Sequence, residues 1–126
     1  MDGSGIASAL KLGAVAAQLG TALVGCPESS ADEGYRKALF GPEAMRTKLT
    51  SLISGRPARS LANRFTALEG DSSEMVVPSY PIAYDAGKAL HQAAKAKREF
   101  GFGAQWAGQG RPWRGACRRR RWCRRS

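Results

Sequence analysis

Residues 14–26 read AVAAQLGTALVGC, and the interpretation of this short apolar stretch decides the fold. It can be the core of a secretory signal, a membrane-spanning segment, or the buried strand of a soluble enzyme. A spanning helix needs about 20 mainly apolar residues. The stretch has 13 residues, and Gln18, Thr21 and two glycines interrupt it. We therefore expect no membrane-spanning segment here.

The secretory interpretation rests on residues 23–26, LVGC, which match a lipoprotein cleavage pattern at a suitable distance from Met1. An export signal normally begins with basic residues. Here the segment before the apolar run opens with Asp2 and offers only Lys11 as a positive charge. The charge pattern therefore favours the third interpretation, a buried strand in a cytoplasmic enzyme.

The flanking sequence predicts an α/β unit around this strand. Residues 4–12 place apolar side chains at helical spacing, with Ser4 as a cap and Gly13 as a stop. Residues 14–19 then form a nearly continuous apolar run, which is typical of a parallel strand covered on both faces. A helix followed by such a strand indicates an α/β fold.

The rest of the chain up to residue 110 reads as mostly helical, and no internal repeat is present. Caps, charge order and glycine stops set the expected helix boundaries. The expected elements are a helix from Ser29 or Ser30 to Phe40, a loop at 41–47, a strand or extended segment at Lys48–Ser54, a punctuating SGRPARS at 54–60, a helix at Leu61–Leu68 stopped by Gly70, a loop at 70–77, a helix from about Ser79 to Arg98 with Pro81 in its first turn, and an irregular glycine-rich segment at 101–110.

The positive charge of the chain belongs to its end. The formal net charge is +10, yet residues 1–110 hold 12 Lys and Arg against 10 Asp and Glu. Residues 111–126 hold eight Arg and no acidic residue. The sequence therefore divides into a nearly neutral domain at 1–110 and a tail at 111–126 that we expect to be disordered.

The cysteines predict neither a disulfide framework nor a metal site. There are three, an odd number for this length. Cys117 and Cys123 have no His or third Cys nearby to complete a zinc set. We expect Cys26 to be a small buried apolar residue.

Gly20 and Thr21 are the first candidate site residues. They follow the C-terminal end of the expected strand, where α/β sheets and barrels bind their ligands. A glycine there lets the backbone approach a ligand, and the N–H groups of a helix start suit a phosphate. The alternative is an ordinary tight turn with a capping Thr21.

A second candidate group lies on the last long helix. Tyr80, Tyr84 and Lys88 are spaced i, i+4 and i+8, so they share one face, where two phenols and an ammonium suit an anion. The alternative is a partly buried aromatic pair beside a solvated lysine. For His91, the only histidine, we expect a surface or supporting role, because no carboxylate or serine stands at an obvious catalytic spacing. Trp106 is expected to pack.

Five stretches, taken in order over about residues 2–110, resemble the C-terminal part of the nitronate monooxygenase family, formerly called 2-nitropropane dioxygenases. Their order and spacing agree with that family, which makes the combination more specific than any one motif. The stretches are DGSGIASALKLGAVAAQLGTALVGCPES, YRKAL, SGRPARSLANRF, YPIAYDAGK and QWAGQG.

The resemblance implies the C-terminal part of an FMN-binding TIM barrel with an added helical segment. Residues 14–19 would then be the eighth strand, and we expect the isolated chain to be mostly helical. No catalytic residue is assigned, because the family's histidine base lies upstream and His91 does not match it. The residues implied near the flavin phosphate are Gln18, Leu19, Gly20 and Thr21, and those implied near the flavin or a bound anion are Tyr80, Tyr84 and Lys88.

The activity implied by the resemblance is the FMN-dependent oxidation of alkyl nitronates by oxygen to a carbonyl compound and nitrite. The implied partners are a small nitronate and oxygen, with no membrane. Other FMN barrels, such as flavin-dependent enoyl reductases, share the phosphate turn. The substrate class therefore rests mainly on residues 80–88, YPIAYDAGK.

With one expected strand of the eight that a barrel needs, we expect this chain to be the last third of such an enzyme. It would be inactive alone and unstable or prone to aggregate, since its strand would present unpaired edges. A sharp cooperative melt with stoichiometric FMN would contradict that expectation.

The tail at 111–126, RPWRGACRRRRWCRRS, departs from the family pattern. Its mixture of Arg, Trp and Cys is expected when a GC-rich reading frame is read out of phase, so we expect a frameshifted terminus. The alternative function is a basic-tailed protein that binds nucleic acid or an anionic membrane. Nucleic acid would otherwise bind the tail only nonspecifically.

Overall fold

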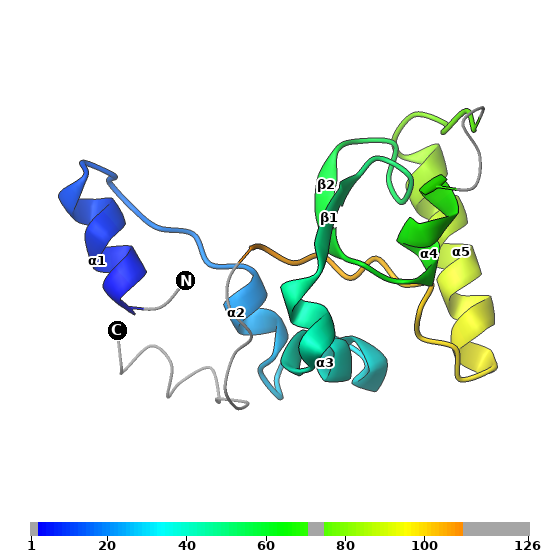
Figure 1. Ribbon diagram of the computed structural model, residues 1–126, viewed down its shortest axis with the longest axis horizontal. Coiled ribbons are helices and arrows are strands. Elements are labelled where there is room, and N and C mark those ends of the chain that lie inside the picture. Colours follow the sequence, from blue (N-terminus) through cyan, green and yellow to red (C-terminus); the bar gives the residue numbers. More distant parts are fainter. Residues whose placement is uncertain (1–2, 71–74, 110–126) are drawn as a thin grey trace.

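The structure is a computed structural model that describes residues 3–70 and 75–109. A two-stranded hairpin stands at its centre with helices around it, and an N-terminal segment projects to one side (Figure 1). The elements in chain order are α1 (Gly3–Lys11), α2 (Thr21–Val24), α3 (Glu33–Phe40), the 3-10 helix η1 (Pro42–Met45), β1 (Thr47–Thr50), β2 (Ala58–Leu61), α4 (Arg64–Ala67), the 3-10 helix η2 (Leu68–Gly70) and α5 (Ile82–Ala96).

The hairpin is extended by a third segment near the end of the described chain. β1 and β2 pair antiparallel, with Thr47 opposite Leu61. On the other side of β2, Ser60 forms a bridge with Trp106, and the Leu61 N–H donates to the Gln105 carbonyl at 2.8 Å. Residues 105–107 therefore cover the second edge of β2, so its backbone groups find partners within the chain.

The core lies on both sides of this small sheet. Neighbouring residues of an extended segment point to opposite faces, and here Trp106 packs with one cluster while Ala107 belongs to the other. The first cluster contains Leu39, Leu61 and Ala107 with Val24, Tyr35 and Ala38 around them, and the second contains Leu52, Ile53 and Phe65 with Val77, Phe102, Ala104 and Trp106 around them.

The expected helices are present, and side-chain caps set the starting points of α3 and α4. α3 begins at Glu33, later than predicted, because the Asp32 carboxylate accepts the Tyr35 N–H at 2.8 Å. α4 begins at Arg64 because Asn63 forms a reciprocal capping box with Thr66. None of the helices within the described ranges is long and apolar enough to cross a membrane.

The predicted strand at residues 14–19 is wrong for this structure. The segment is irregular and mostly exposed, and it runs alone between α1 and α2 (Figure 1). A strand needs a neighbour to take up its backbone hydrogen bonds. No other described segment pairs with residues 14–19, so most of their apolar side chains stay exposed.

The second strand of the hairpin was not predicted from the sequence. The undecided segment at Lys48–Ser54 is a strand over its first residues, which belong to β1, and a turn after them. Residues 54–60, interpreted only as punctuation, contain most of β2. Because Leu61 ends this strand, the helix predicted at Leu61–Leu68 is shortened to α4. The predicted tail at 111–126 lies outside the described residues.

Candidate functional site

The first candidate group forms the start of α2. Gly20 precedes the helix, and the Thr21 hydroxyl oxygen accepts the Gly108 N–H at 2.9 Å, which ties this turn to the end of the described chain. Within the described residues, the backbone N–H groups of Thr21 and Ala22 donate to no acceptor. A Cβ placed on Gly20 would meet nothing within 4 Å, so space is open beside these donors.

The other two residues implied near a phosphate lie on the irregular segment before α2. Gln18 is exposed and Leu19 is half-buried. On the wall formed by α2 and the chain after it there is an open hollow of about 380 Å³. Gly20 and Glu28 both line that hollow, so the space beside the free donors also contains a carboxylate, which repels a phosphate. Cys26 is buried as predicted.

The second candidate group is assembled along the start of α5. The Tyr80 and Tyr84 rings stack with their centroids 6.1 Å apart and their planes 28° apart. The Lys88 ammonium lies 4.3 Å from the centroid of the Tyr84 ring. α5 begins at Ile82, later than the predicted start near Ser79, so helical spacing places Tyr84 and Lys88 on one face, whereas Tyr80 joins them from the turn before the helix. The functional role of the three residues stays a prediction.

A residue that the sequence interpretation missed extends this row. The Arg56 guanidinium carbon lies 5.1 Å from the centroid of the Tyr80 ring. Arg56 comes from the turn that connects β1 and β2, so only tertiary packing brings it to α5. We refer to Arg56, Tyr80, Tyr84 and Lys88 as the tyrosine row.

The two candidate groups stand apart in the structure. α2 and the start of α5 lie on opposite sides of the hairpin (Figure 1). The described residues therefore supply two separate surfaces and no enclosed site that combines them.

His91 has a specific supporting contact, in line with the role expected for it. Its Nε2 lies 3.1 Å from Oδ2 of Asp32, and Lys95 Nζ lies 3.9 Å from the same oxygen. The other oxygen of Asp32 caps α3 through Tyr35. Asp32 thus connects the start of α3 to the middle of α5. No local sequence pattern indicates this pair, because 59 residues separate its members.

Tyr35 connects α3 to the segment at residues 105–107 that borders β2. Its phenol donates a hydrogen bond to the Trp106 carbonyl. Burial, together with the nearby Asp32 carboxylate, raises the pKa of Tyr35 to about 12, because both effects disfavour the phenolate. The phenol therefore remains a donor at all ordinary pH values and fixes residues 105–107 against α3. Trp106 packs against the second core cluster, as predicted.

Metal binding has no candidate within residues 3–70 and 75–109, where no group of three His, Cys, Asp or Glu side chains is placed to hold an ion. Cys117, Cys123 and the arginine tail lie outside those ranges. The expectations about the tail therefore stay untested.

Comparison with known sequences gives a consistent family assignment. The family model for nitronate monooxygenase matches residues 1–114. The nitronate monooxygenase of Paraburkholderia phytofirmans is 67% identical over 109 residues, which are 86% of this chain and 30% of that protein. The nitronate monooxygenase of Pseudomonas aeruginosa is 56% identical over 110 residues, or 87% of this chain and 31% of that protein. The chain thus spans about 30% of the length of these relatives.

A solved structure agrees with the sequence comparison. Nitroalkane oxidase from Streptomyces ansochromogenes superposes with a TM-score of 0.76 at 42% sequence identity, and the match covers 87% of this chain and 31% of that one. Identity at this level over most of the chain, together with the family match over residues 1–114, shows that the chain belongs to the nitronate monooxygenase family.

Proposed function

We propose that this chain carries two parts of an FMN-dependent nitronate monooxygenase: a turn that binds the flavin phosphate and a wall that faces the anionic substrate. The observation that carries the proposal is the position of both surface groups inside residues 1–114, the range that matches the family. Relatives named nitronate monooxygenase and a neighbour named nitroalkane oxidase support oxidation of nitro compounds as the reaction class.

The residues at the start of α2 fit the phosphate end of FMN. Thr21 and Ala22 offer two unpaired backbone N–H groups, and the Thr21 hydroxyl has its hydrogen to donate while its oxygen accepts from Gly108. The absence of a side chain at Gly20 leaves room for phosphate oxygens. Gln18 and Leu19 would border the same turn. Nothing among the described residues encloses an isoalloxazine ring, so the remaining walls of a flavin site must come from outside them.

FMN, when bound, supplies the electron transfer that converts a nitronate and oxygen into a carbonyl compound and nitrite. The contribution of this chain is electrostatic and steric. Lys88 favours the nitronate anion over the neutral nitroalkane, and the phenols of Tyr80 and Tyr84 can donate hydrogen bonds to its oxygens. His91 is engaged with Asp32, which leaves it a structural contact and no base. We therefore propose that the chain alone does not catalyse nitronate oxidation.

Flavin binding tests this function directly. Riboflavin and FMN are titrated into the full chain, and quenching of flavin fluorescence is measured. We expect weak binding of FMN and about tenfold weaker binding of riboflavin, because only FMN carries the phosphate that charge-assisted hydrogen bonds would hold. Equal affinity for the two flavins would contradict the proposed turn.

Two glycines provide a matched pair of variants. Gly20→Asp places a carboxylate beside the free N–H groups, whereas Gly70→Asp adds the same charge where a Cβ also meets nothing within 4 Å. We expect Gly20→Asp to weaken FMN binding about tenfold through charge repulsion, and Gly70→Asp to leave it unchanged. Equal effects of the two substitutions would show that FMN does not use the α2 turn.

A further inference from the structure

The tyrosine row is longer than the sequence pattern indicates, and it carries a cation at each end. Three contacts follow one another from Arg56 to Tyr80, from Tyr80 to Tyr84 and from Tyr84 to Lys88, at 5.1, 6.1 and 4.3 Å. Tyr80 is 49% exposed and Lys88 is exposed as well, so solutes can reach the row. Each cation lies over a ring, an arrangement that favours a defined position of the charge.

Arg56 is held at this position by the backbone around it. The Ser54 hydroxyl accepts the Arg56 N–H at 3.4 Å and donates to the Arg56 carbonyl at 3.1 Å, which closes the turn. Gly55 has φ +75°, and a Cβ on it would overlap the Pro78 carbonyl and approach the Tyr80 nitrogen to 2.7 Å. The turn thus packs against the backbone that leads into α5. This close approach requires a glycine and presents Arg56 to the Tyr80 ring.

The charges around the row are unevenly balanced. The Lys88 ammonium pairs with the Asp85 carboxylate at 3.3 Å, so part of its charge is offset. Within residues 3–70 and 75–109, the Arg56 guanidinium pairs with no carboxylate. The end of the row at Arg56 is therefore its more electropositive end, and the carboxylate beside Lys88 weakens anion binding at the other end.

We propose that Arg56 is a specificity-determining residue of this row, which binds the two oxygens of a planar oxyanion. A guanidinium presents two parallel N–H groups that match a nitronate or a carboxylate, whereas a lysine offers a point charge. Tyr80 supports the ligand from the adjacent position. That the natural ligand is a nitronate rests on the proposed function, whereas the planar-anion site itself rests only on the contacts above.

The three tyrosines of the chain allow a direct measurement. NMR spectra of the full chain with 13C-labelled tyrosine rings are recorded during titration with the nitronate of nitroethane, with acetate and with inorganic phosphate. We expect the two planar anions to shift the Tyr80 and Tyr84 ring signals. Tyr35, which is engaged with Trp106, should remain unchanged and serves as the internal control. Phosphate, which is tetrahedral, should bind more weakly.

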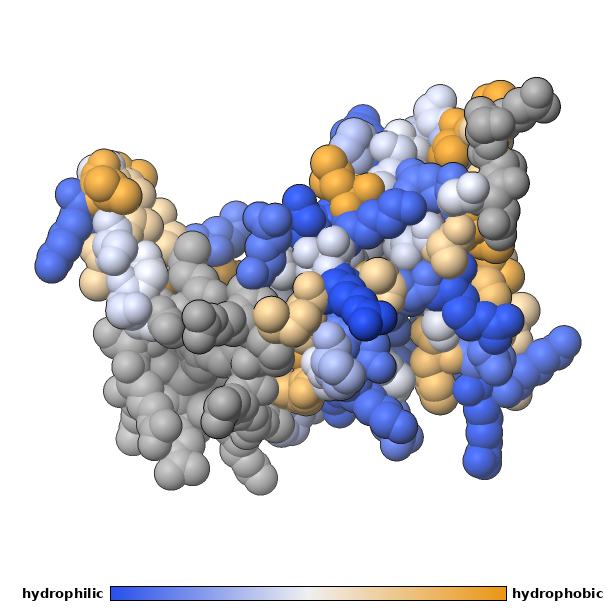
Figure 2. Space-filling view, viewed as in Figure 1, coloured by the Kyte–Doolittle hydropathy of each residue, from blue (hydrophilic) through white to orange (hydrophobic). Residues whose placement is uncertain are grey.

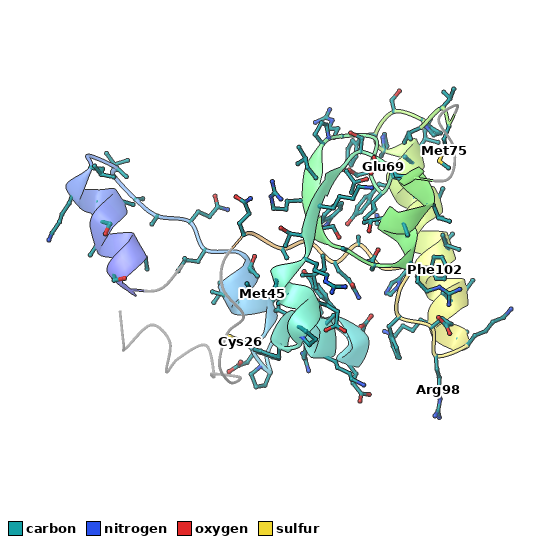
Figure 3. All side chains as sticks on the ribbon, in the orientation of Figure 1. Cys26, Met45, Glu69, Met75, Arg98 and Phe102 are labelled. Carbon is teal, nitrogen blue, oxygen red and sulfur yellow. The ribbon has the colours of Figure 1, made fainter. Side chains whose placement is uncertain are left out.

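Substitutions separate the role of Arg56 from a general effect of charge. Arg56→Gln should weaken binding of the planar anions about fivefold. Arg56→Lys should weaken it less, because lysine keeps the positive charge but lacks the two parallel N–H groups of the guanidinium. Arg98→Gln removes an exposed arginine at the far end of α5, where the side chain points away from the body (Figure 3), and should have no effect. Asp85→Asn should tighten binding about twofold, because it removes the opposing carboxylate.

Three results would overturn the proposal: equal effects of Arg56→Gln and Arg98→Gln, phosphate binding as tight as the planar anions, or a Tyr35 signal at the position of an unfolded chain. The last result would mean that the chain is unfolded and that the turn carrying Arg56 does not pack against Tyr80. Failure of the proposed function is distinguishable. A chain that binds planar anions at the row without preferring FMN over riboflavin keeps the site and loses the flavin assignment.

Discussion

The N-terminal arm (residues 3–19) and the body (residues 20–70 and 75–109) bury their apolar side chains to very different degrees. α1 has no buried residue, and Leu12 and Val15 in the arm are 89% and 102% exposed. In the body, Leu61 is 0% and Ile53 1% exposed. Figure 2 shows apolar surface at the outer end of the arm and also in patches on the body, where Val76 is 90% exposed, so the two regions differ in whether they have a buried core.

The difference shows which contacts this chain completes by itself. The body closes its sheet with residues 105–107 and packs both faces of that sheet. The arm has the composition of a packed element, yet no described segment lies against it. The apolar side chains of the arm therefore gain little burial from the described chain. The body should therefore unfold cooperatively, and the arm should contribute little to that transition.

The largest expected effect distinguishes the two regions with one kind of substitution. Leu61→Ala removes a fully buried side chain from the first core cluster and should lower the free energy of unfolding by about 3 kcal/mol. Leu12→Ala removes the same atoms from an exposed position and should change it by less than about 0.5 kcal/mol. Urea denaturation followed by circular dichroism measures both. Equal losses would show that the arm is packed in solution.

The next effect compares two glycines in the left-handed region. Gly55 (φ +75°) is crowded by the backbone before α5, whereas Gly13 (φ +97°) ends α1 with nothing within 4 Å of a Cβ. Gly55→Ala should destabilise the body by about 2 kcal/mol, because strain and overlap add.

Gly13→Ala should cost about 1 kcal/mol within the arm alone and leave the midpoint of the body unchanged. The same urea denaturation distinguishes them. A body midpoint that falls equally for both variants would contradict the contrast between crowded and open turns.

Local sequence signals predicted the helices well and the strand pairing poorly. Asp32 and Asn63 cap their helices through contacts within three residues, which a sequence displays directly. β2 depends on β1 and on Trp106, and neither partner is visible from residues 58–61 alone. The apolar run at 14–19 is typical of a strand that pairs with neighbouring strands, and the described chain provides no such strand. A strand was therefore expected where the structure has none.

The candidate site divides in the same way. The alignment of Tyr84 and Lys88 follows from helical periodicity, so the sequence was sufficient to predict it. Tyr80 lies in the turn before α5, and its stacking on Tyr84 depends on the path of that turn. Arg56 reaches Tyr80, and His91 reaches Asp32, only after the hairpin and α3 pack against α5. Such contacts have no signature in residue spacing. The roles of Gly20 and Thr21 stay predictions that the flavin experiment addresses.

A smaller effect concerns the contact between α3 and the edge of the sheet. Tyr35→Phe removes the donor to the Trp106 carbonyl and should destabilise the body by about 1 kcal/mol. The folded pKa of Tyr35, about 12, lies above the unfolded value of 10.0. The stabilisation is therefore complete below pH 10 and is lost as the pH rises toward 12.

An absorbance titration of the phenols tests this dependence. Tyr35→Phe should remove the ionisation near pH 12 from the titration of the chain. A titration near pH 12 that Tyr35→Phe leaves unchanged would mean that the Tyr35 pocket is open to water.

The smallest expected effect comes from the ion pair between Lys48 and Glu69, whose charged atoms lie 2.9 Å apart. The hydrogen bond from Lys48 is the largest cause that lowers the pKa of Glu69 below 4.5, and Thr50 adds to it. The stabilisation is therefore present above pH 4.5 and is lost as the pH falls through the lowered pKa.

Both side chains are over a third exposed, so water and salt weaken the attraction. Lys48→Met should reduce stability by about 0.3 kcal/mol at low ionic strength and neutral pH, with no reduction in 1 M salt and a smaller one as the pH falls below 4.5. Lys11→Met, in the arm, is the matched control and should have no effect under any of these conditions. A loss with Lys48→Met that persists in 1 M salt would assign the contribution to the packing of the lysine stem and not to its charge, because salt screens only the charge interaction.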